Sequence, residues 1–483
     1  MSQVLAEFEI ETKPGGLGRY DHMALCTALG IKDDPARVVV EQDGMTKAFV
    51  VVYDANPLAS TDPPCGQDLL MDSRGRIIIG RYHDGNPVYL RLFDMLTGSA
   101  QRMAIFGTTG AGKSRSLQLI LAAFKANGIV TWLADLKKGQ SVPEANGHVE
   151  WRATTPQEAI HQLRAAVRVA EDRMDRYAKL GRTAFIPDDP DPLLFVVLDE
   201  ANRLLEKSSR YRKEAAALIK DLSRAGRSVG VGVIIAAQAS HLEELGGSDT
   251  LRAMIKEGEV ILLRWTSSLM RQLVSDGLLP QGVRLQPIPK YLGGVKLRSR
   301  FDTSGHEDGA SRPGTQGSAY HVTGEHPMSL FRFSRVGSIA ATRGLDPQIL
   351  ALYGDGPVPT IEAASVKLAG EQYAIRGTGV VLPLNPRKDK TETAGGTKPS
   401  GDADDDEDVE DDEDDEEDTD GPRRLSDRIL DVLAAGPKST YEVLTALKSD
   451  GGSDVRPGSV RNALTDLKQT GAITTTDGTH SRA

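Results

Sequence analysis

The sequence predicts an α/β fold in which a parallel sheet is covered by helices on both faces. Between about residues 79 and 345, short apolar segments of strand length alternate with amphipathic helical segments. A glycine-rich motif at 107–114 joins one such strand to a helix, and the apolar run at 193–198 ends in two acidic residues. Polar residues at the carboxyl ends of parallel strands are typical of ligand sites in open α/β sheets.

Composition and patterning divide the 483 residues into five segments. In the first of them a helix is expected near 22–29 and strands near 37–41 and 48–53. The five segments are a small N-terminal α/β unit (1–78), the α/β core (79–345), an extension associated with the core (346–384), a linker (385–424) and a C-terminal unit (425–483).

The linker is expected to be disordered. Its first half is rich in Lys, Thr, Gly and Pro, and 16 carboxylates follow between Asp402 and Asp420, a composition that cannot offset the entropy of ordering. The formal net charge of the chain is -10, so the residues outside this acidic run carry about +6, which suits a polyanionic partner. The run is either a solvated tether or a mimic of nucleic acid that covers basic surfaces.

The C-terminal unit is predicted to be a winged helix-turn-helix, with three short helices followed by a hairpin. Apolar residues recur at helical spacing, and Ser439 with Glu442 forms a capping box for the second helix. In such a domain the third helix enters the major groove of DNA. Its expected DNA contacts are Ser459, Arg461, Asn462 and Lys468. The alternative is a docking or dimerisation module, since the unit is only slightly basic.

The motif at 107–114 satisfies GxxxxGK[ST], follows the apolar strand 103–106 and opens a helix expected over 116–126. In this context backbone N–H groups wrap nucleotide phosphates at a helix N-terminus. Lys113 supplies a positive charge to the terminal phosphates, and the Ser114 hydroxyl binds Mg²⁺. The residues expected to bind ATP are Gly107, Thr108, Thr109, Gly110, Ala111, Gly112, Lys113, Ser114 and Arg115.

Asp199 and Glu200 complete the expected ATPase site. They follow the second apolar strand, so both carboxylates leave the sheet at its carboxyl edge. Asp199 is expected to hold Mg²⁺, and Glu200 to be the general base that orients and deprotonates the attacking water. The competing interpretation is an ordinary strand that ends in solvated acids. Gln238, after the strand 229–237, is a candidate sensor of the γ-phosphate, and Asp135 lies at a similar strand end.

Over roughly residues 79–345 these segments resemble the FtsK/SpoIIIE translocase family. The chain departs from the family at Ala237, where threonine is usual. The motifs that carry the resemblance are Ile79-Gly80-Arg81 with Asp84-Gly85-Asn86-Pro87-Val88, Trp132-Leu133-Ala134-Asp135-Leu136-Lys137, Arg173-Met174-Asp175-Arg176-Tyr177, and the segment from Ser223 to Gln238.

The resemblance implies a RecA-like P-loop ATPase motor that forms a homo-hexameric ring, with ATP between subunits and double-stranded DNA threaded through the centre. Arg176 or Arg227 would be the arginine finger that reaches the γ-phosphate of a neighbouring subunit. A structural ion pair is an equally good interpretation of either arginine. The N-terminal and C-terminal units look most like those of plasmid-transfer motors of the TraB/TraSA type.

Two other functions are compatible with the sequence: a protein-exporting ATPase of the type VII secretion kind, and a DNA-binding protein that uses ATP only to assemble. The apolar runs are far shorter than the roughly 20 residues that span a bilayer, and the N-terminus lacks the pattern of a signal peptide. A cytoplasmic protein is therefore expected, held at a membrane, where required, by a membrane-bound partner. Cys26 and Cys65 are the only cysteines, which excludes a disulfide framework.

Overall fold

The computed structural model comprises two compact units, residues 1–388 and 389–483, and each is described by itself. The structure describes most of the first unit and part of the second. The described residues are 2–11, 13, 21–31, 34–43, 46–238, 258–264, 285, 287–291, 314–322, 329–384, 425–449, 460, 463–464, 467–468, 472–476 and 479–482.

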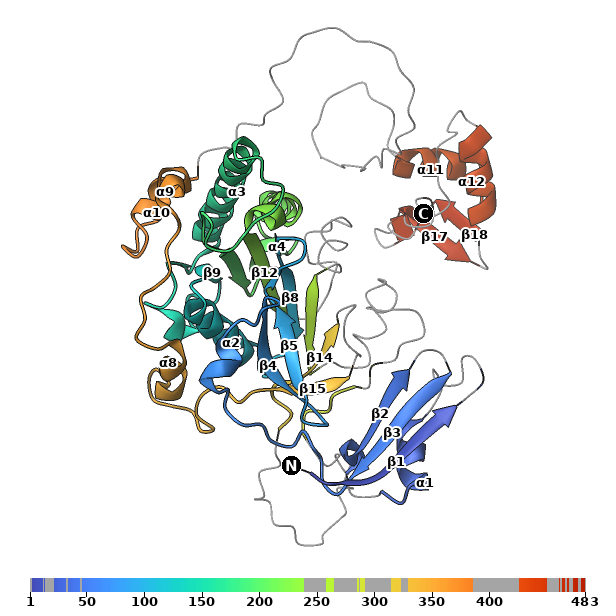
Figure 1. Cartoon of the computed structure of the whole chain (residues 1–483). Helices are drawn as coiled ribbons and strands as arrows, with labels where there is room; N and C mark the ends of the chain where they lie inside the picture. Colours follow the sequence, from blue (N-terminus) through green and yellow to red (C-terminus); the bar gives the residue numbers. More distant parts are fainter. Residues whose placement is uncertain are drawn as a thin grey trace. The chain divides into compact units, whose positions relative to one another are not determined.

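A small antiparallel sheet with one helix forms the N-terminal part of the first unit (Figure 1). α1 packs Cys26 against apolar side chains of the sheet, which gives this part a core of its own. The first strand was not predicted, although apolar and acidic residues alternate along it with the period of a strand. The strand order is β1-β3-β2, with β1 at Val4–Glu11, β2 at Val38–Asp43 and β3 at Lys47–Tyr53, and α1 spans His22–Ala28.

A ten-stranded sheet forms the body of the first unit, in the order β10-β9-β11-β12-β8-β13-β14-β15-β4-β5. Strands β10 to β13 of this order are parallel, and the others pair antiparallel. The expectation of a parallel sheet is therefore correct for only part of it, because β14, β15 and the hairpin β4-β5 extend it with antiparallel pairs. The bounds are β4 (Arg76–Tyr82), β5 (Pro87–Arg91), β8 (Arg102–Gly107), β9 (Val130–Asp135), β10 (Trp151–Ala153), β11 (Leu194–Asp199), β12 (Val231–Gln238), β13 (Glu259–Leu263), β14 (Ser318–Val322) and β15 (Leu330–Phe333).

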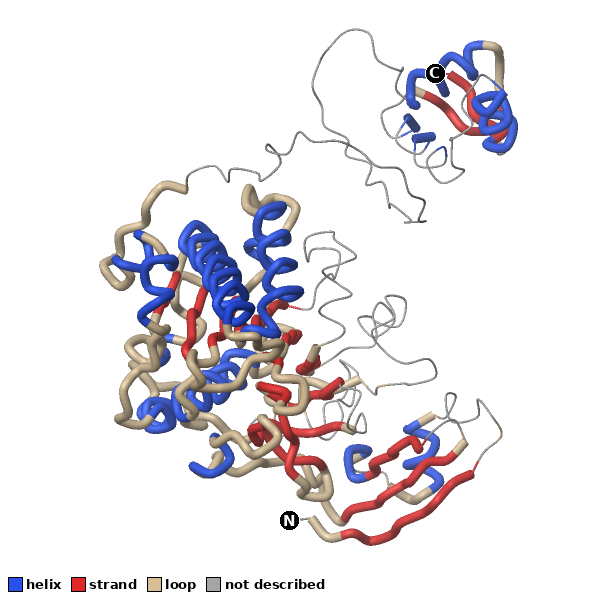
Figure 2. The backbone as a smooth tube through the Cα atoms, turned by 45° about the horizontal axis from the view of Figure 1, so that its top comes forward, coloured by secondary structure: helices blue, strands red, loops and turns tan. Residues whose placement is uncertain are grey.

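Helices cover both faces of the parallel part (Figures 1 and 2). α2 (Lys113–Ala126) carries the chain from β8 to β9, whereas α3 (Pro156–Lys179) and α5 (Arg212–Asp221) carry it the opposite way along the sheet. Because crossovers between parallel strands are right-handed, α2 lies on one face and α3 with α5 on the other. Every residue of β8, β9 and β11 is consequently buried. Short elements complete the unit: η2 (Pro35–Arg37), η3 (Gly66–Leu69), β6 (Phe93–Asp94), β7 (Ser99–Ala100), η4 (Pro143–Ala145), α4 (Asn202–Leu205), η5 (Leu222–Gly226) and η6 (Arg227–Val229).

The extension after residue 345 wraps around the β10 edge of the sheet. α8 (Pro347–Tyr353) packs on α2, whereas α9 (Ala363–Ala369) and α10 (Glu371–Ala374) pack on α3, which lies on the opposite face. The Ile361 amide, between α8 and α9, and the Tyr373 hydroxyl, on α10, both donate to the Glu150 carboxylate, next to β10. The extension therefore holds helices of both faces together.

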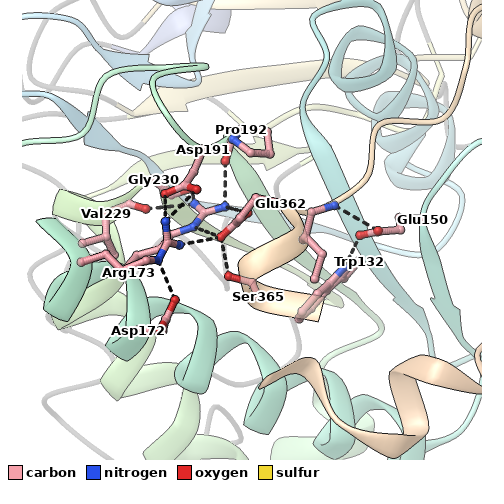
Figure 3. A network of polar contacts seen from close by, with 12 residues as sticks. Trp132, Glu150, Asp172, Arg173, Asp191, Pro192, Val229, Gly230, Glu362 and Ser365 are labelled. Atoms are coloured by element: carbon pink, nitrogen blue, oxygen red, sulfur yellow. Dashed lines mark hydrogen bonds and ion pairs between the residues drawn. The ribbon is translucent and has the colours of Figure 1, made fainter. Parts of the chain in front are cut away.

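Glu362, at the start of α9, anchors the extension to α3 through a buried polar network (Figure 3). Its carboxylate accepts from Arg173 at 2.7 and 3.0 Å and from Arg176 at 2.9 Å. Burial disfavours the charge of Glu362, but the hydrogen bond and the charge of Arg173, together with the hydrogen bond from Ser365, outweigh it, and the pKa of Glu362 is lowered. Arg173 is itself fully buried, and it also donates to the carbonyl oxygens of Pro192, Val229 and Gly230.

The second unit contains two well-described helices and a small sheet in the order β16-β18-β17. The capping box predicted for its second helix is confirmed. The Glu442 carboxylate accepts a hydrogen bond from the Ser439 amide at 2.8 Å, and the Glu442 amide donates one to the Ser439 hydroxyl at 3.3 Å. Apolar side chains at the predicted helical spacing form its core. The bounds are α11 (Leu425–Ala434), β16 (Lys438–Ser439), α12 (Thr440–Ser449), β17 (Ile473–Thr476) and β18 (Thr479–Arg482).

The winged-helix interpretation of this unit stays a prediction. Of its expected DNA contacts, Lys468 is exposed. The linker 385–424 and the residues Ser459, Arg461 and Asn462 lie outside the described residues. Among the helices of the described residues, none combines the length and the hydropathy that a transmembrane span requires.

Candidate functional site

The strand ends that carry the predicted site residues meet at the carboxyl edge of the parallel strands. β8 ends at Gly107, directly before the phosphate loop at 107–114, and β12 ends opposite it at Gln238. β11 pairs with β12 on the other side and ends at Asp199, opposite Ala236. One strand, β12, therefore separates the phosphate loop from the acidic pair, and side chains from all three strands meet at this edge.

The phosphate loop is shaped by two glycines and supported by a neighbouring segment. Gly110 has φ +73° and Gly112, the N-cap of α2, has φ +108°, conformations that disfavour a Cβ. A Cβ on Gly112 would lie 2.8 Å from the amide nitrogen of Gly317, and that amide donates to the Ala111 carbonyl oxygen at 2.8 Å. The loop thus presents backbone N–H groups and the positive end of the α2 dipole to an anion.

Lys113, the first residue of α2, connects the loop to both acids. The side chain is buried; its ammonium group donates to Asp199 Oδ1 and lies 3.2 Å from Glu200 Oε1. Two adjacent buried carboxylates need such a cation, since an unpaired buried charge is strongly destabilising. Neither acid is therefore a solvated strand-end residue.

Asp199 has an oxygen suited to a metal ion. The residue is fully buried, and among the described residues no group donates a hydrogen bond to its Oδ2. Burial raises the pKa of Asp199, and the charge of Lys113 opposes that rise. Mg²⁺ prefers carboxylate, hydroxyl and phosphate oxygens, so Asp199 and the hydroxyl of Ser114, at the start of α2, fit a Mg²⁺ ion bound together with nucleotide phosphates.

Glu200 is positioned by its backbone and by Gln238. Its φ of +54° is a left-handed conformation that costs a non-glycine residue about 1 kcal/mol or more, which is typical of functional sites. Gln238 Nε2 lies 3.2 and 3.4 Å from the two carboxylate oxygens of Glu200, and the Thr109 hydroxyl lies 3.4 Å from Gln238 Oε1. Gln238 therefore joins the phosphate loop to Glu200, a position suited to a sensor of the γ-phosphate.

The Arg115 side chain turns away from the phosphate loop, so its predicted part in nucleotide binding can be played only by its backbone N–H at the start of α2. Its guanidinium donates to the Val336 carbonyl oxygen at 2.9 Å and to Asp346 at 3.0 Å. Asp346 caps the N-terminus of α8. Arg115 consequently ties α2 to the extension, because the next side chain along a helix points about 100° away from that of Ser114.

Arg176 and Arg227 lie at the amino edge of the sheet, opposite the phosphate loop. Arg227 begins η6 directly before β12, whose eight residues place it about 25 Å from Gln238. Arg176 binds Asp191, shortly before β11, at 2.9 Å. Two further carboxylates contact the Arg176 guanidinium, those of Asp172 and Glu362. Neither arginine is placed to reach the phosphate loop of its own chain.

Asp135, the other strand-end acid, supports the fold. It is fully buried, and its carboxylate accepts the backbone N–H groups of Lys137, Ser141 and Val142 at 3.2, 2.9 and 3.2 Å. These bonds shape the turn after β9, so Asp135 takes no direct part in the arrangement around Lys113.

One cation beside the loop was not identified from the sequence. Arg264 follows β13, the strand that pairs with β8 on the side away from β12, with Leu263 opposite Gly107. It is buried, and its Nη1 lies 3.7 Å from the position of a Cβ on Gly110. No local motif marks this arginine, and only the pairing of β13 with β8 brings it to the loop.

Part of the chain is similar to known ATPases of secretion and conjugation. A family model described as Schlafen group 3, DNA/RNA helicase domain, matches residues 101–300. The ESX secretion system protein EccC of Thermomonospora curvata is 30% identical over 200 residues, which cover 37% of this chain and 15% of EccC.

Two solved structures are similar over a larger part of the chain. The first is the cytoplasmic domain of the Thermomonospora curvata type VII secretion ATPase EccC. The matched region covers 64% of this chain and 34% of the EccC chain, with 20% sequence identity and a TM-score of 0.42. The second is the pCW3 conjugation coupling protein TcpA, in its monomer form with ATPγS. The matched region covers 69% of this chain and 88% of the TcpA chain, with 15% sequence identity and a TM-score of 0.44. The phosphate loop that opens α2, and the strands that run parallel on both sides of β8, give the first unit a mixed α/β fold of the P-loop ATPase kind.

Proposed function

We propose that this chain is an ATP-driven motor that moves double-stranded DNA and works as a homo-hexameric ring. The observation that carries the proposal is the convergence of Lys113, Asp199 and Glu200 at the phosphate loop, with an unpaired oxygen of Asp199 among them. Phosphoryl transfer needs positioning and charge stabilisation more than covalent chemistry from the protein, and these side chains supply both.

ATP binding changes the partners of Lys113. Its ammonium group, bound by two carboxylates in the structure, turns to the phosphate oxygens on the loop. Asp199 and Ser114 would hold Mg²⁺, whose charge would stabilise the β- and γ-phosphates. Glu200, released from Lys113, orients the attacking water and accepts its proton. Gln238 links this step to β12 through its contact with Glu200.

A neighbouring subunit completes the site. Because Arg176 and Arg227 lie at the amino edge of the sheet, either can act only on a nucleotide bound by another subunit. Burial opposes the charge of Arg176, but the hydrogen bonds to Asp191 and Asp172 outweigh it and raise its pKa. An arginine held this firmly must break several ion pairs before it can act elsewhere. Arg227, the other candidate for the finger, is half-buried on η6 and lies 3.5 Å from the Ser99 hydroxyl.

The proposal that DNA is the substrate rests on the C-terminal unit and on charge. Outside the acidic run the chain carries a net charge of about +6, which favours a polyanion. The C-terminal unit, as a winged helix, would select or orient the duplex through its third helix, with Ser459, Arg461, Asn462 and Lys468 as contacts.

A second candidate function is protein export. The 30% identity to the secretion protein EccC over 200 residues favours it. A pull-down separates the two functions: an exporter retains a secreted protein, whereas a DNA motor retains duplex DNA.

Displacement of a third strand from linear duplex DNA tests the motor directly. We expect the wild-type protein to strip the third strand in an ATP-dependent way and Lys113→Ala to leave it in place. A protein that binds duplex and ATP but leaves the triplex intact would be a DNA-binding switch, and the motor proposal would be wrong.

A further inference from the structure

Arg264 is a buried cation beside the phosphate loop. β13 ends one residue before it and pairs with β8, on the side of the loop opposite the strands that carry Asp199 and Gln238. Only 5% of the residue is exposed, and its Nη1 lies 3.7 Å from the position of a Cβ on Gly110. The guanidinium is therefore within reach of a ligand that lies on the loop.

The described residues leave this guanidinium incompletely bonded. Its Nε and Nη2 are buried and have no hydrogen-bond partner among them. Burial lowers the pKa of Arg264, and Tyr291 partly offsets this effect. Two other arginines differ: the fully buried Arg173 donates to Glu362 and to carbonyl oxygens, and the partly buried Arg332 donates to the carbonyl oxygens of Leu58 and Gly314. A buried charge without partners is strongly destabilising, so Arg264 needs an anion that the described protein residues do not provide.

The backbone of Arg264 is held in one position by hydrogen bonds to the phosphate loop and to β14. Arg264 has φ +43°, a strained conformation for a residue with a Cβ. Its amide donates to the Ser318 carbonyl oxygen at 3.0 Å, and its carbonyl oxygen accepts from the Thr108 hydroxyl at 3.4 Å. The loop and β14 thus hold a strained residue in place, as the surroundings of functional residues do.

We infer that Arg264 binds the γ-phosphate of ATP on the phosphate loop of its own subunit and so favours ATP over ADP. The inference rests on the proposed ATP binding and adds a second cation to Lys113. A planar guanidinium matches two phosphate oxygens at once. Arg264 contacts the first half of the loop, where Thr109 connects through Gln238 to Glu200. The γ-phosphate must lie near Glu200, and therefore near this half.

Arg264→Met tests the inference because it removes the charge and retains a long side chain. We expect its affinity for ATP to fall about tenfold or more, the loss typical of a charged hydrogen bond, and its affinity for ADP to fall much less. The melting temperature of the nucleotide-free protein should stay unchanged or rise, since an unpaired buried charge is lost. A structural arginine would give the reverse, a lower melting temperature with unchanged ATP affinity. Equal losses for ATP and ADP would contradict the assignment to the γ-phosphate.

Two comparison variants separate this inference from the proposed function. Arg164 pairs with Glu214 between α3 and α5, on the face opposite α2, so Arg164→Met should retain the wild-type ATP affinity. Lys113→Ala should lose ATP binding. If it does and Arg264→Met binds ATP like the wild type, the role of Arg264 is wrong and the ATPase proposal stands. If the wild-type protein does not bind ATP, both are wrong.

Discussion

Replacing Glu200 by glutamine is expected to abolish ATP hydrolysis while ATP binding is retained. The amide keeps the size of the side chain but cannot accept a proton from the attacking water, and loss of a general base lowers turnover about 10²- to 10⁴-fold. The change also removes a negative charge 3.2 Å from Lys113, so ATP should bind at least as tightly as to the wild type. Phosphate release and titration with a fluorescent ATP analogue measure the two quantities.

Glu206→Gln is the matched control for this variant. Glu206 lies at the C-terminal end of α4, in the segment that follows the acidic pair, and it has no contact with Lys113 among the described ion pairs. Its replacement should leave turnover unchanged. If Glu200→Gln hydrolysed ATP at the wild-type rate, Glu200 would not be the general base.

Replacing Arg173 by methionine is expected to lower the free energy of unfolding by about 3–5 kcal/mol, a large part of the stability of a typical domain. Arg173 is fully buried and donates to Glu362 and to three carbonyl oxygens. Without it these acceptors stay buried with fewer donors, and the extension loses its strongest anchor to α3. Urea denaturation followed by circular dichroism measures the change.

Arg176→Met provides the comparison for Arg173. Arg176 binds the same carboxylate, but its side chain is 24% exposed, so solvent screens its ion pairs and water can replace it. A smaller loss of stability is therefore expected. Equal losses in the two variants would show that burial is not the source of the effect.

The strands and the helix that build the phosphate loop could be predicted from local patterns. β8, α2, β11 and β12 lie within a few residues of their expected positions, because apolar runs and the GxxxxGK[ST] motif are visible over short stretches. The antiparallel part of the sheet could not be predicted in this way. β15 pairs with β4, where Phe331 lies opposite Tyr82, about 250 residues earlier, and nothing local specifies such a partner.

In the candidate site, too, some residues could be predicted from local patterns and others depend on long-range strand pairing. Asp199, Glu200 and Gln238 were identified because each ends an apolar strand, and strand ends of a parallel sheet share one edge. Arg115 was included because it follows Ser114, but consecutive side chains of a helix point about 100° apart, and its guanidinium contacts Val336 and Asp346 instead of the loop. Arg264 was missed because its place depends on the pairing of β13 with β8.

The rate of ATP hydrolysis, measured with and without linear duplex DNA, tests the central proposal most directly. We expect duplex DNA to raise the rate several-fold and Lys113→Ala to show no hydrolysis under either condition. An equal rate with and without duplex, at saturating ATP, would contradict a motor that couples Lys113 and Glu200 to movement of DNA.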